Sequence, residues 1–528
     1  MPLSDVADLV AVAAAEQPER LAVVEAGGRG LTWSELDTEV DRIASGLGAA
    51  GIVAGHRVMI AAGNRLEFVA TYLGILRAQA VAVPVNPGST AVELARMVVD
   101  SGTRLVVADP DTVTAVREAV AAMTEYDGEG APLSPPRVVV IGATLQPGER
   151  SYDHLRASTV RHVPPLPDPE KLAVLLYTGG ATGRPRAAML THRALLANIE
   201  QVAAVEPPMM HSDDVVLGVL PLFHVYGLNA VLGGVLRHRA KLVLAERFDR
   251  EGTLDLIEDE ACSVVPVAPP VFAYWRDMEA LAERLGPVRL VLSGSAPLSA
   301  ETIRRFADQT GIPVHQGYGL TEAAPVVTST LRSEHPKAGS VGAALDGIEL
   351  RLVDDDGTPL GGATADDPGE IQVRGDNLFS GYWPDGSGGP DADGWWSTGD
   401  VGFLDDDGDL FLVDRVKELV IVSGFNVYPT EVEAVLDVVP GVRQSAVIGV
   451  PDDETGEAVV AYVVPDDPAA DAETLRAAVA AACEQNLARF KNPARIEVVE
   501  ALPRTVTGKV QKGRLRGAER RRVGGDLL

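Results

Sequence analysis

Cysteine is scarce in this chain of 528 residues, which carries only Cys262 and Cys483. Two cysteines far apart in the sequence supply neither a disulfide framework nor the closely spaced pairs of a zinc site. Proteins of reducing compartments commonly lack structural disulfides, so we expect a cytoplasmic protein.

Positive charge is also in short supply, with Lys+Arg 46 against Asp+Glu 75 and a net charge of −29. This balance argues against a general nucleic-acid binder or a protein that binds anionic membranes. The net charge does not exclude a small polyanionic ligand, because a pocket can be locally positive on an acidic protein. Residues 504–528 hold eight Lys or Arg against Glu519 and Asp526, so the positive charge is concentrated near the C-terminus.

Long hydrophobic runs are rare. Residues 215–236 are the one candidate for a membrane span, since they contain no Asp, Glu, Lys or Arg. Their length could cross a bilayer, but Pro221, His224, Asn229 and four glycines interrupt the run. We therefore predict a buried strand, loop and helix here and no membrane span. The N-terminus carries Asp5 and Asp8 where a secretion signal needs Lys or Arg.

The first part of the chain alternates helical and strand patterns. Residues 31–51 have helical periodicity, and 56–63 form a short apolar run ending in glycine. Residues 67–87 and 93–110 each read as a helix followed by a strand. Alternation at this spacing predicts βαβ units with a parallel sheet.

A different pattern begins in the second half. The acidic segment DDDG recurs at 354–357 and 405–408 between short alternating strands, which predicts antiparallel hairpins. After Asp414 the chain restarts with strands and with helices near 430–438 and 471–489, enough for a small α+β domain. We place the domain boundary at 414–417.

A glycine-rich segment at 175–192, LLYTGGATGRPRAAMLTH, is the strongest local signal for chemistry. An apolar strand enters a loop rich in glycine and threonine, with Arg184 and Arg186 beside it. Backbone N–H groups of such a turn converge on phosphate oxygens, and hydroxyl and guanidinium groups add donors. The segment matches neither the Walker A loop nor G-x-G-x-x-G, and alone it could be a flexible surface turn.

Four further motifs follow in order along the chain. They are QGYGLTE (316–322), GWWSTGD (394–400), DRVKELVIVSGFNVYPTEVE (414–433) and LPRTVTGK (502–509). Together with the glycine-rich loop they resemble the adenylate-forming (AMP-binding) superfamily of acyl-CoA synthetases, amino-acid adenylation domains and luciferases. The resemblance runs from about residue 10 to about residue 516 and is closest to the acyl-CoA synthetase and fatty-acid–CoA ligase branch.

The resemblance implies a multidomain α/β fold. A large N-terminal adenylation domain, 1–414, would contain βα-layered sheets and a distorted antiparallel β-barrel. A small mobile α+β domain, 415–528, would act as a lid. Such enzymes use ATP and Mg²⁺ to convert a carboxylic acid into an acyl-adenylate, and a thiol, usually that of CoA, then displaces AMP. Positioning and charge stabilisation should dominate this chemistry.

The resemblance assigns the glycine-rich loop to the β- and γ-phosphates, with Thr178 also near the metal. The family usually has Ser, Thr and Lys where this chain has Gly179, Ala181 and Arg186, so we expect a weakened or retuned loop. The residues assigned to it are Thr178, Gly179, Gly180, Ala181, Thr182, Gly183 and Arg186.

Other residues take nucleotide roles by the same resemblance. Tyr318 would lie along the adenine, and Thr321 would bond the α-phosphate. Glu322 would bind Mg²⁺, which proteins hold with one or two carboxylates plus substrate phosphates. Its alternative is an acid at a helix N-terminus. The resemblance also assigns to the nucleotide site six further residues of the segments 293–299 and 316–322. They are Gly294, Ser295, Ala296, Gln316, Gly317 and Gly319.

Catalysis is assigned chiefly to Lys509, which would bridge the substrate carboxylate and the nucleotide and leave when the small domain rotates. His224 would lie near the carboxylate, with a packed core histidine as the alternative. Asp400 would accept hydrogen bonds from the ribose, and Arg415 would reach the ribose or a phosphate. Lys417 matches the hinge position, where the side chain says little about chemistry.

The resemblance also suggests residues for CoA. Phe490 would stack on its adenine and Lys491 would bind its phosphates. Gly424 and Phe425 would line the tunnel for its pantetheine arm. The sequence leaves open a homodimer.

The segments expected to shape the acyl pocket are 221–229, 265–272, 293–297 and 316–322, and they are mainly apolar. No cation for a second carboxylate and no acid for an α-amino group stands out in them. A medium- or long-chain fatty acid or an aryl acid fits best, and Gly227, Gly294 and Gly317 suggest a deep pocket. Alternatives are a ligase that loads a carrier protein, a luciferase-type oxidative enzyme, and a weakened nucleotide-binding relative.

Overall fold

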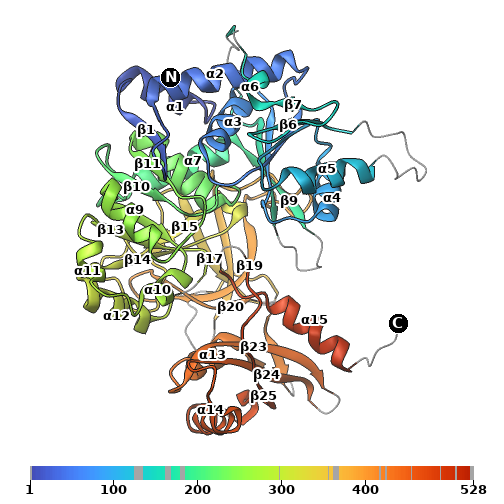
Figure 1. The fold of residues 1–528 in the computed structure, drawn as a ribbon. Helices are drawn as coiled ribbons and strands as arrows, with labels where there is room; N and C mark the ends of the chain where they lie inside the picture. The colour runs from blue at the N-terminus through green and yellow to red at the C-terminus, as the bar shows by residue number, and fades with distance from the viewer. Residues whose placement is uncertain are drawn as a thin grey trace. The chain divides into compact units, whose positions relative to one another are not determined.

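The chain folds into two compact units in a computed structural model (Figure 1). Unit 1 comprises Met1–Glu349 with Arg374–Trp396, and unit 2 comprises Leu350–Val373 with Ser397–Leu528. The residues that the structure describes are 3–123, 135–157, 159–160, 168–178, 185–296, 298–354, 356–360, 368–415, 418–422, 425–452, 455–487, 489–505 and 508–523.

A seven-stranded sheet in unit 1 has the order β7-β6-β5-β3-β4-β8-β9 within the described residues. Its strands pair in parallel, except that β9 runs antiparallel to β8. The strands are β3 (Arg57–Ala61), β4 (Val81–Pro84), β5 (Leu105–Ala108), β6 (Arg137–Val140), β7 (Arg150–Ser151), β8 (Leu172–Thr178) and β9 (Arg186–Thr191). The predicted parallel βα units are therefore confirmed.

The helices of this region begin where the sequence supplies capping groups. Thr32 and Glu35 form a capping box at the start of α2 (Trp33–Ala49). Thr90 and Glu93 do the same for α4 (Ala91–Ser101), which ends at Gly102 with φ of 62°. The other helices here are α1 (Asp8–Glu16), α3 (Leu66–Arg77), α5 (Val113–Met123) and α6 (Tyr152–Leu155).

A nine-stranded sheet forms the rest of unit 1, in the order β16-β15-β14-β13-β12-β10-β11-β1-β2. The strands are β1 (Leu21–Glu25), β2 (Gly30–Thr32), β10 (Val215–Gly218), β11 (Lys241–Leu244), β12 (Val264–Val267), β13 (Leu290–Ser293), β14 (Val314–Gly319), β15 (Val326–Ser329) and β16 (Ala343–Ala344). Strands β10, β12, β13 and β14 are parallel neighbours. Their carboxyl ends, where α/β sheets bind ligands, therefore carry the loops that follow 218, 293 and 319.

The helices around this second sheet include one irregular segment. They are α7 (His192–Ala203), the π-helix η1 (Tyr226–Gly233), α8 (Gly234–His238), α9 (Gly252–Glu260), α10 (Pro270–Trp275), α11 (Leu281–Arg284), α12 (Ala300–Thr310) and the 3₁₀ turn η2 (Thr321–Ala323). The uncharged run 215–236 forms β10, η1 and part of α8, which confirms the predicted strand, loop and helix. No helix among the described residues has the length and apolar character to cross a membrane.

The four-stranded sheet β17-β18-β19-β20 has most of its residues in unit 2. Its strands are β17 (Ile348–Val353), β18 (Gly369–Gly375), β19 (Trp396–Leu404) and β20 (Leu410–Arg415). The predicted acidic turns are present. The Asp405 carboxylate accepts the backbone N–H groups of Asp407 and Asp409, and Asp354 makes the same contacts with Asp356 and Thr358.

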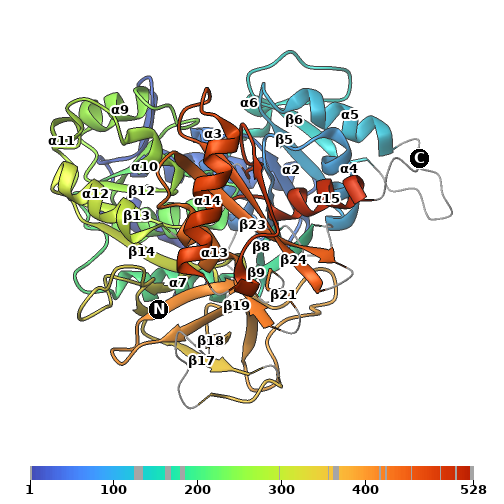
Figure 2. The same ribbon diagram turned by 90° about the horizontal axis from the view of Figure 1, so that it is seen from below.

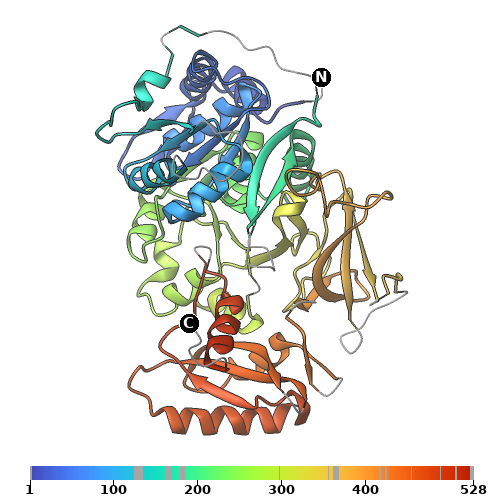
Figure 3. The same ribbon diagram turned by 90° about the vertical axis from the view of Figure 1, so that its right-hand side faces the viewer.

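The C-terminal part of unit 2 is a five-stranded sheet with helices on both faces (Figures 2 and 3). Its elements are β21 (Val420–Val422), β22 (Phe425–Val427), α13 (Pro429–Leu436), β23 (Val442–Asp452), β24 (Gly456–Pro465), α14 (Ala472–Asn486), η3 (Arg489–Lys491), β25 (Arg495–Val498) and α15 (Lys512–Val523). Val447 and Val459 pack toward α13 and α14, whereas Ala446 and Val460 pack toward Leu515 of α15. This alternation is the period of two expected of a strand with two covered faces.

The small α+β domain that the sequence predicts after residue 414 thus has its own core. The two units divide the chain elsewhere, since unit 2 also includes Leu350–Val373 and begins its last segment at Ser397. The boundary at 414–417 and the mobility of the small domain stay predictions. The two cysteines lie in separate cores, Cys262 in unit 1 and Cys483 in unit 2. Burial raises the pKa of Cys262 to about 12, so its thiol is inert.

Asn64 connects the two sheets of unit 1. It follows β3, is buried, and donates through Nδ2 to the carbonyl oxygens of Gly218 and Leu220 at 3.1 and 2.9 Å. Its Oδ1 accepts the N–H of Leu222 at 2.9 Å. The side chain therefore satisfies three backbone groups of the loop that leads from β10 to His224.

We predict that Asn64→Ala lowers the free energy of unfolding by about 3 kcal/mol, because it removes the side-chain partner of the buried Leu220 carbonyl and Leu222 N–H, whereas the Gly218 carbonyl still accepts the N–H of Ala245. Urea denaturation would measure the change. Asn86→Ala is the matched control, since Asn86 accepts one exposed hydrogen bond from Gly88. It should change stability by less than about 0.5 kcal/mol. Equal effects of the two variants would contradict the role of Asn64.

Candidate active site

The glycine-rich loop joins two antiparallel strands. Thr178, the last residue of β8, pairs with Arg186, the first residue of β9, and its hydroxyl donates to the Arg186 carbonyl at 3.4 Å. Gly179, Gly180, Ala181, Thr182 and Gly183 lie outside the described residues. Their role in phosphate binding therefore stays a prediction.

The QGYGLTE motif forms β14 and the turn η2. Gln316, Tyr318 and Glu322 are buried, and Glu322 is 8% exposed. Gln316 accepts the N–H of Leu298 at 3.0 Å, which ties the motif to the loop after β13. Gly317 and Gly319 stand between these residues in β14, and Thr321 begins η2.

Tyr382 connects Glu322 to Arg186. The Tyr382 hydroxyl donates to Oε1 of Glu322 at 2.7 Å, and the Arg186 guanidinium lies 3.6 Å from the centre of the Tyr382 ring. Burial raises the pKa of Tyr382, and the charge of Glu322 raises it further, so the hydroxyl keeps its proton and donates. The structure thus brings two predicted site residues together through a third that the sequence reasoning missed.

The loop after β13 carries unsatisfied polar groups. The hydroxyls of Ser293 and Ser295 are buried and have no hydrogen-bond partner among the described residues. Ser295 also has a φ of 75°, a conformation that few residues other than glycine adopt. Such strain and unpartnered donors are typical of a ligand-binding loop. The assignment of Gly294, Ser295 and Ala296 to the nucleotide stays a prediction.

His224 stands just before the π-helix η1, a rare form that often marks functional sites. Its side chain is partly buried, and Nδ1 accepts the N–H of Tyr226 at 3.3 Å. In the neutral ring the proton is therefore on Nε2. His224 is oriented by its own chain segment, and its contact with a substrate carboxylate stays a prediction.

The expectation that three glycines give the acyl pocket depth is wrong. A Cβ atom on Gly227 would lie 2.3 Å from the carbonyl oxygen of Pro221, and one on Gly317 would lie 2.6 Å from that of Thr328. A Cβ on Gly294 would lie 2.7 Å from the Tyr226 ring. These glycines permit close packing of backbone and ring, so the space beside them is already filled.

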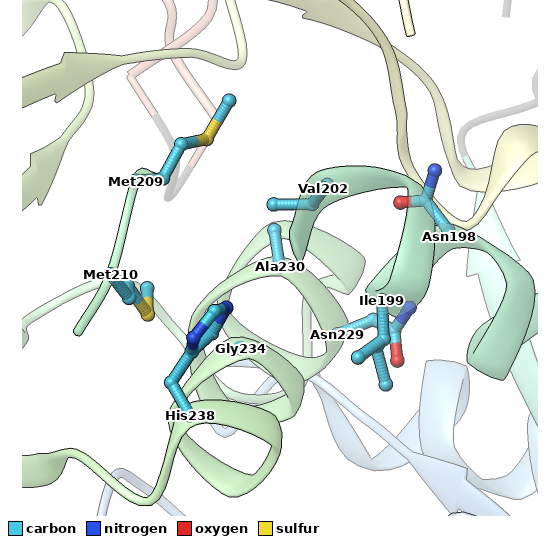
Figure 4. A pocket seen from close by; sticks show the side chains of 9 residues that line it. All are labelled: Asn198, Ile199, Val202, Met209, Met210, Asn229, Ala230, Gly234 and His238. Carbon is cyan, nitrogen blue, oxygen red and sulfur yellow. The ribbon is translucent and has the colours of Figure 1, made fainter. Parts of the chain in front are cut away.

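A small pocket lies beside η1, on the side of α7 and α8 (Figure 4). Its lining is mainly apolar, with the amides of Asn198 and Asn229 and the ring of His238 at its edge. Of the four segments expected to shape the acyl pocket, only 221–229 contributes, through Asn229. The lining residues are Asn198, Ile199, Val202, Met209, Met210, Asn229, Ala230, Gly234 and His238.

Asp400 and Arg415 are direct partners across strands β19 and β20 of unit 2. Asp400 is buried, and its N–H donates to the Thr398 hydroxyl at 3.1 Å. The two residues assigned to the ribose are thus brought to one place in the sheet. Lys417 and Gly424 lie outside the described residues.

Lys509 stands on a tight turn of unit 2. Its N–H donates to the Thr505 hydroxyl at 3.0 Å, and its carbonyl accepts the N–H of Thr505 at 2.8 Å. Just beyond, Lys512 pairs with Glu433 at 2.9 Å and with Glu418 at 3.3 Å. Burial acts to raise the pKa of Glu418, but the charges of Lys512, Arg516 and Lys509 hold it below its usual value.

The residues assigned to CoA are held within the small domain. Phe490 packs against its core, and Lys491 pairs with both oxygens of Glu431 at 2.6 and 2.7 Å. Phe425 begins β22. Nothing in this arrangement tests CoA binding, and the four assignments stay predictions.

The donor groups of unit 1 fit a magnesium nucleotide. A single buried carboxylate, Glu322, suits Mg²⁺ that takes its other ligands from phosphates and water. The orphaned hydroxyls of Ser293 and Ser295 and the guanidinium of Arg186 supply neutral and charged donors.

Two family profiles match the chain. The AMP-binding enzyme profile matches residues 10–383, and the AMP-binding enzyme C-terminal domain profile matches residues 431–509. The resemblance based on five motifs, and the layout of a large N-terminal and a small C-terminal part, are therefore confirmed, whereas the boundary between the two parts stays a prediction.

Individual relatives are similar over nearly the whole chain. A 4-coumarate–CoA ligase of Narcissus pseudonarcissus is 32% identical, with 92% of this chain and 88% of the relative covered. A long-chain-fatty-acid–CoA ligase of Bacillus subtilis is 31% identical, with 98% and 94% covered. The ATP-bound structure of MatB from Rhodopseudomonas palustris superposes with a TM-score of 0.84 at 32% identity, covering 97% of this chain and 98% of MatB. These similarities confirm the α/β multidomain fold and the acyl-CoA ligase class that the sequence predicts.

We predict that Ser295→Gly stabilises the free protein by about 1 kcal/mol, because glycine adopts φ of 75° without strain and the buried hydroxyl is removed. The same change should weaken AMP binding about fivefold through loss of a donor. Thermal unfolding and calorimetric titration with AMP would measure the two effects. Ser295→Ala separates them, because it removes the hydroxyl but keeps the strain. A Ser295→Gly protein less stable than Ser295→Ala would contradict this account.

Proposed function

Because this chain belongs to the AMP-binding enzyme family of adenylate-forming acyl-CoA ligases, we propose that it activates an aryl or fatty carboxylic acid with ATP and transfers the acyl group to CoA. The observation that carries the proposal is the junction of Arg186, Tyr382 and Glu322, where a cation and a metal-binding carboxylate meet. ATP, Mg²⁺ and CoA are the cofactors and co-substrates that this reaction requires.

In the first step the acid's carboxylate oxygen attacks the α-phosphorus of ATP and pyrophosphate leaves. Arg186 would offset charge on the departing phosphates and Thr178 would donate a hydrogen bond to them, and Glu322 would hold Mg²⁺, which would supply further positive charge there. Thr321 donates to the α-phosphate. Lys509 supplies positive charge where negative charge develops in the transition state, which is the most effective use of a cation.

In the second step the sulfur of CoA attacks the acyl carbon, and AMP leaves with its phosphate oxygen. Asp400 and Arg415 hold the ribose and phosphate of the nucleotide through both steps. Phe490, Lys491, Gly424 and Phe425 are our proposed contacts with CoA. The Lys491–Glu431 pair would have to open for such a contact.

An aryl acid is the preferred substrate in our proposal. The Tyr226 ring fills the space beside Gly294, which disfavours a long straight pocket there and supplies an aromatic wall. Relatives that are 32% and 34% identical to this chain include 4-coumarate–CoA ligases. Medium- and long-chain fatty acids remain the second class to be tested.

Exchange of labelled pyrophosphate into ATP tests the first step. We predict exchange that depends on an added acid and falls at least about a hundredfold in Lys509→Ala, since a charge used in the transition state is lost. Arg514→Ala is the control, because it removes an exposed positive charge from the same basic segment. It should retain activity. Absence of exchange with every acid in a broad panel would contradict an acid-activating enzyme and favour a nucleotide-binding relative.

A panel of hydroxycinnamic, benzoic, fatty and dicarboxylic acids with CoA tests the second step. Mass spectrometry of the thioester should give the largest kcat/KM for an aryl acid. Product that forms only with an acyl carrier protein would select the carrier-loading alternative. A preference for a dicarboxylic acid would contradict the proposed substrate class.

We predict that Tyr226→Ala shifts the ratio of kcat/KM for a long-chain fatty acid over that for an aryl acid about tenfold upward, because it opens space beside Gly294. Tyr274→Ala is the control, since this ring is 54% exposed. An unchanged ratio in Tyr226→Ala would show that this ring does not face the acyl group.

A further inference from the structure

Tyr382 is held by backbone pairing that fixes where its side chain points. It forms an antiparallel bridge with Ala188 of β9, and the N–H of Trp383 donates to the Ala187 carbonyl at 2.8 Å. Its own N–H donates to the carbonyl of Ser387 at 3.0 Å. The segment that carries Tyr382 is therefore bridged to β9, the strand that carries Arg186.

The segment is equally tied to the turn that carries Glu322. The N–H of Phe379 donates to the Glu322 carbonyl at 2.9 Å, and Asn377 donates through Nδ2 to the Ala323 carbonyl at 2.7 Å. The Phe379 ring packs edge-on against the Tyr382 ring, with centroids 5.0 Å apart. The segment 377–383, which includes Tyr382, is thus hydrogen-bonded to β9 on one side and to η2 on the other.

The face of the ring and its hydroxyl serve different partners. Arg186 stacks on the face at 3.6 Å, and the hydroxyl donates to Glu322 at 2.7 Å. Gly388 leaves room for the stack, since a Cβ atom there would lie 3.3 Å from both Arg186 and the ring. The contact uses the flat face of the guanidinium, and its N–H donors lie in the guanidinium plane.

We propose that Tyr382 is a positioning residue that fixes the Glu322 carboxylate for Mg²⁺ and the Arg186 guanidinium for the phosphates of the same nucleotide. A buried carboxylate needs a hydrogen-bond donor, and the Tyr382 hydroxyl uses one of its four lone-pair sites. The fixed rotamer lowers the entropy lost when a metal binds.

The stack also accounts for arginine at position 186, where the family usually has lysine. An ammonium group has no flat face and would not lie on the ring in this way. In this chain, Arg186 is therefore held over Tyr382, and the orientation of its side chain is set by an aromatic ring.

The test is equilibrium binding of α,β-methylene ATP to the full chain, measured by calorimetry in excess Mg²⁺ and in EDTA. The proposal rests on the Mg-ATP chemistry of the proposed function, but the titration contains neither acid nor CoA, so its result is independent of the proposed substrate. In Tyr382→Phe, which keeps the ring and the stack, we expect the Kd in Mg²⁺ to rise about tenfold through loss of a hydrogen bond to a charged group. The Kd in EDTA should change less than about twofold, because the stacked Arg186 is retained.

Tyr462→Phe is the matched control, because it removes a buried hydroxyl that donates to a different carboxylate, Glu519, in unit 2. Both of its Kd values should stay within about twofold of the parent protein, as expected for an independent site that shares no partner with Tyr382. Adding Tyr382→Phe to Glu322→Gln should leave the Kd in Mg²⁺ unchanged within about twofold, since the partner is already lost. Equal rises of Kd in Mg²⁺ and EDTA, no rise in either, or full additivity with Glu322→Gln would overturn the proposal.

Discussion

Burial of the Glu322 carboxylate is the constraint on which the site in unit 1 depends. An ionised carboxylate taken out of water costs several kcal/mol unless donors surround it. The chain answers with the Tyr382 hydroxyl, and the backbone around Tyr382 is fixed by β9 on one side and by η2 on the other. The arrangement that provides a donor for one buried carboxylate therefore also places Glu322 and Arg186 on the same tyrosine, Tyr382.

Single side chains also hold the loops at the carboxyl ends of the parallel strands. Asn64 holds the loop before His224, Gln316 holds the loop after β13, and Tyr226 fills the space beside Gly294. Asn64 and Gln316 are buried and Tyr226 is partly buried, and each bonds to or packs against the backbone of a neighbouring loop. Loops at the carboxyl ends of strands are free to vary in sequence, so such cross-loop contacts are what give them one conformation.

Local patterns predicted much of the fold because they report local physics. Alternating strand and helix periods gave the parallel units, and the DDDG segments gave turns in which Asp405 and Asp354 bond the backbone. The ordered motifs identified the class of enzyme. The pairing of Asp400 with Arg415, which belong to two different motifs, became known only from the strand register of the structure. Depth of the acyl pocket was misjudged at Gly227, Gly294 and Gly317. A glycine opens space only if nothing else occupies it, and the occupant is a residue far away in the sequence.

Tyr382 shows the same limit from the other direction. Its neighbours Gly381 and Trp383 suggest only a turn and a packed aromatic side chain. Nothing in the local sequence indicates a contact with Glu322, which lies sixty residues earlier. Antiparallel pairing of its segment with β9, formed at residue 188, creates the contact. A role of this kind becomes visible only when three segments meet, because the chemistry belongs to the junction and to none of the segments alone. Arginine at position 186 is therefore better understood as half of a stacked pair than as a substituted lysine.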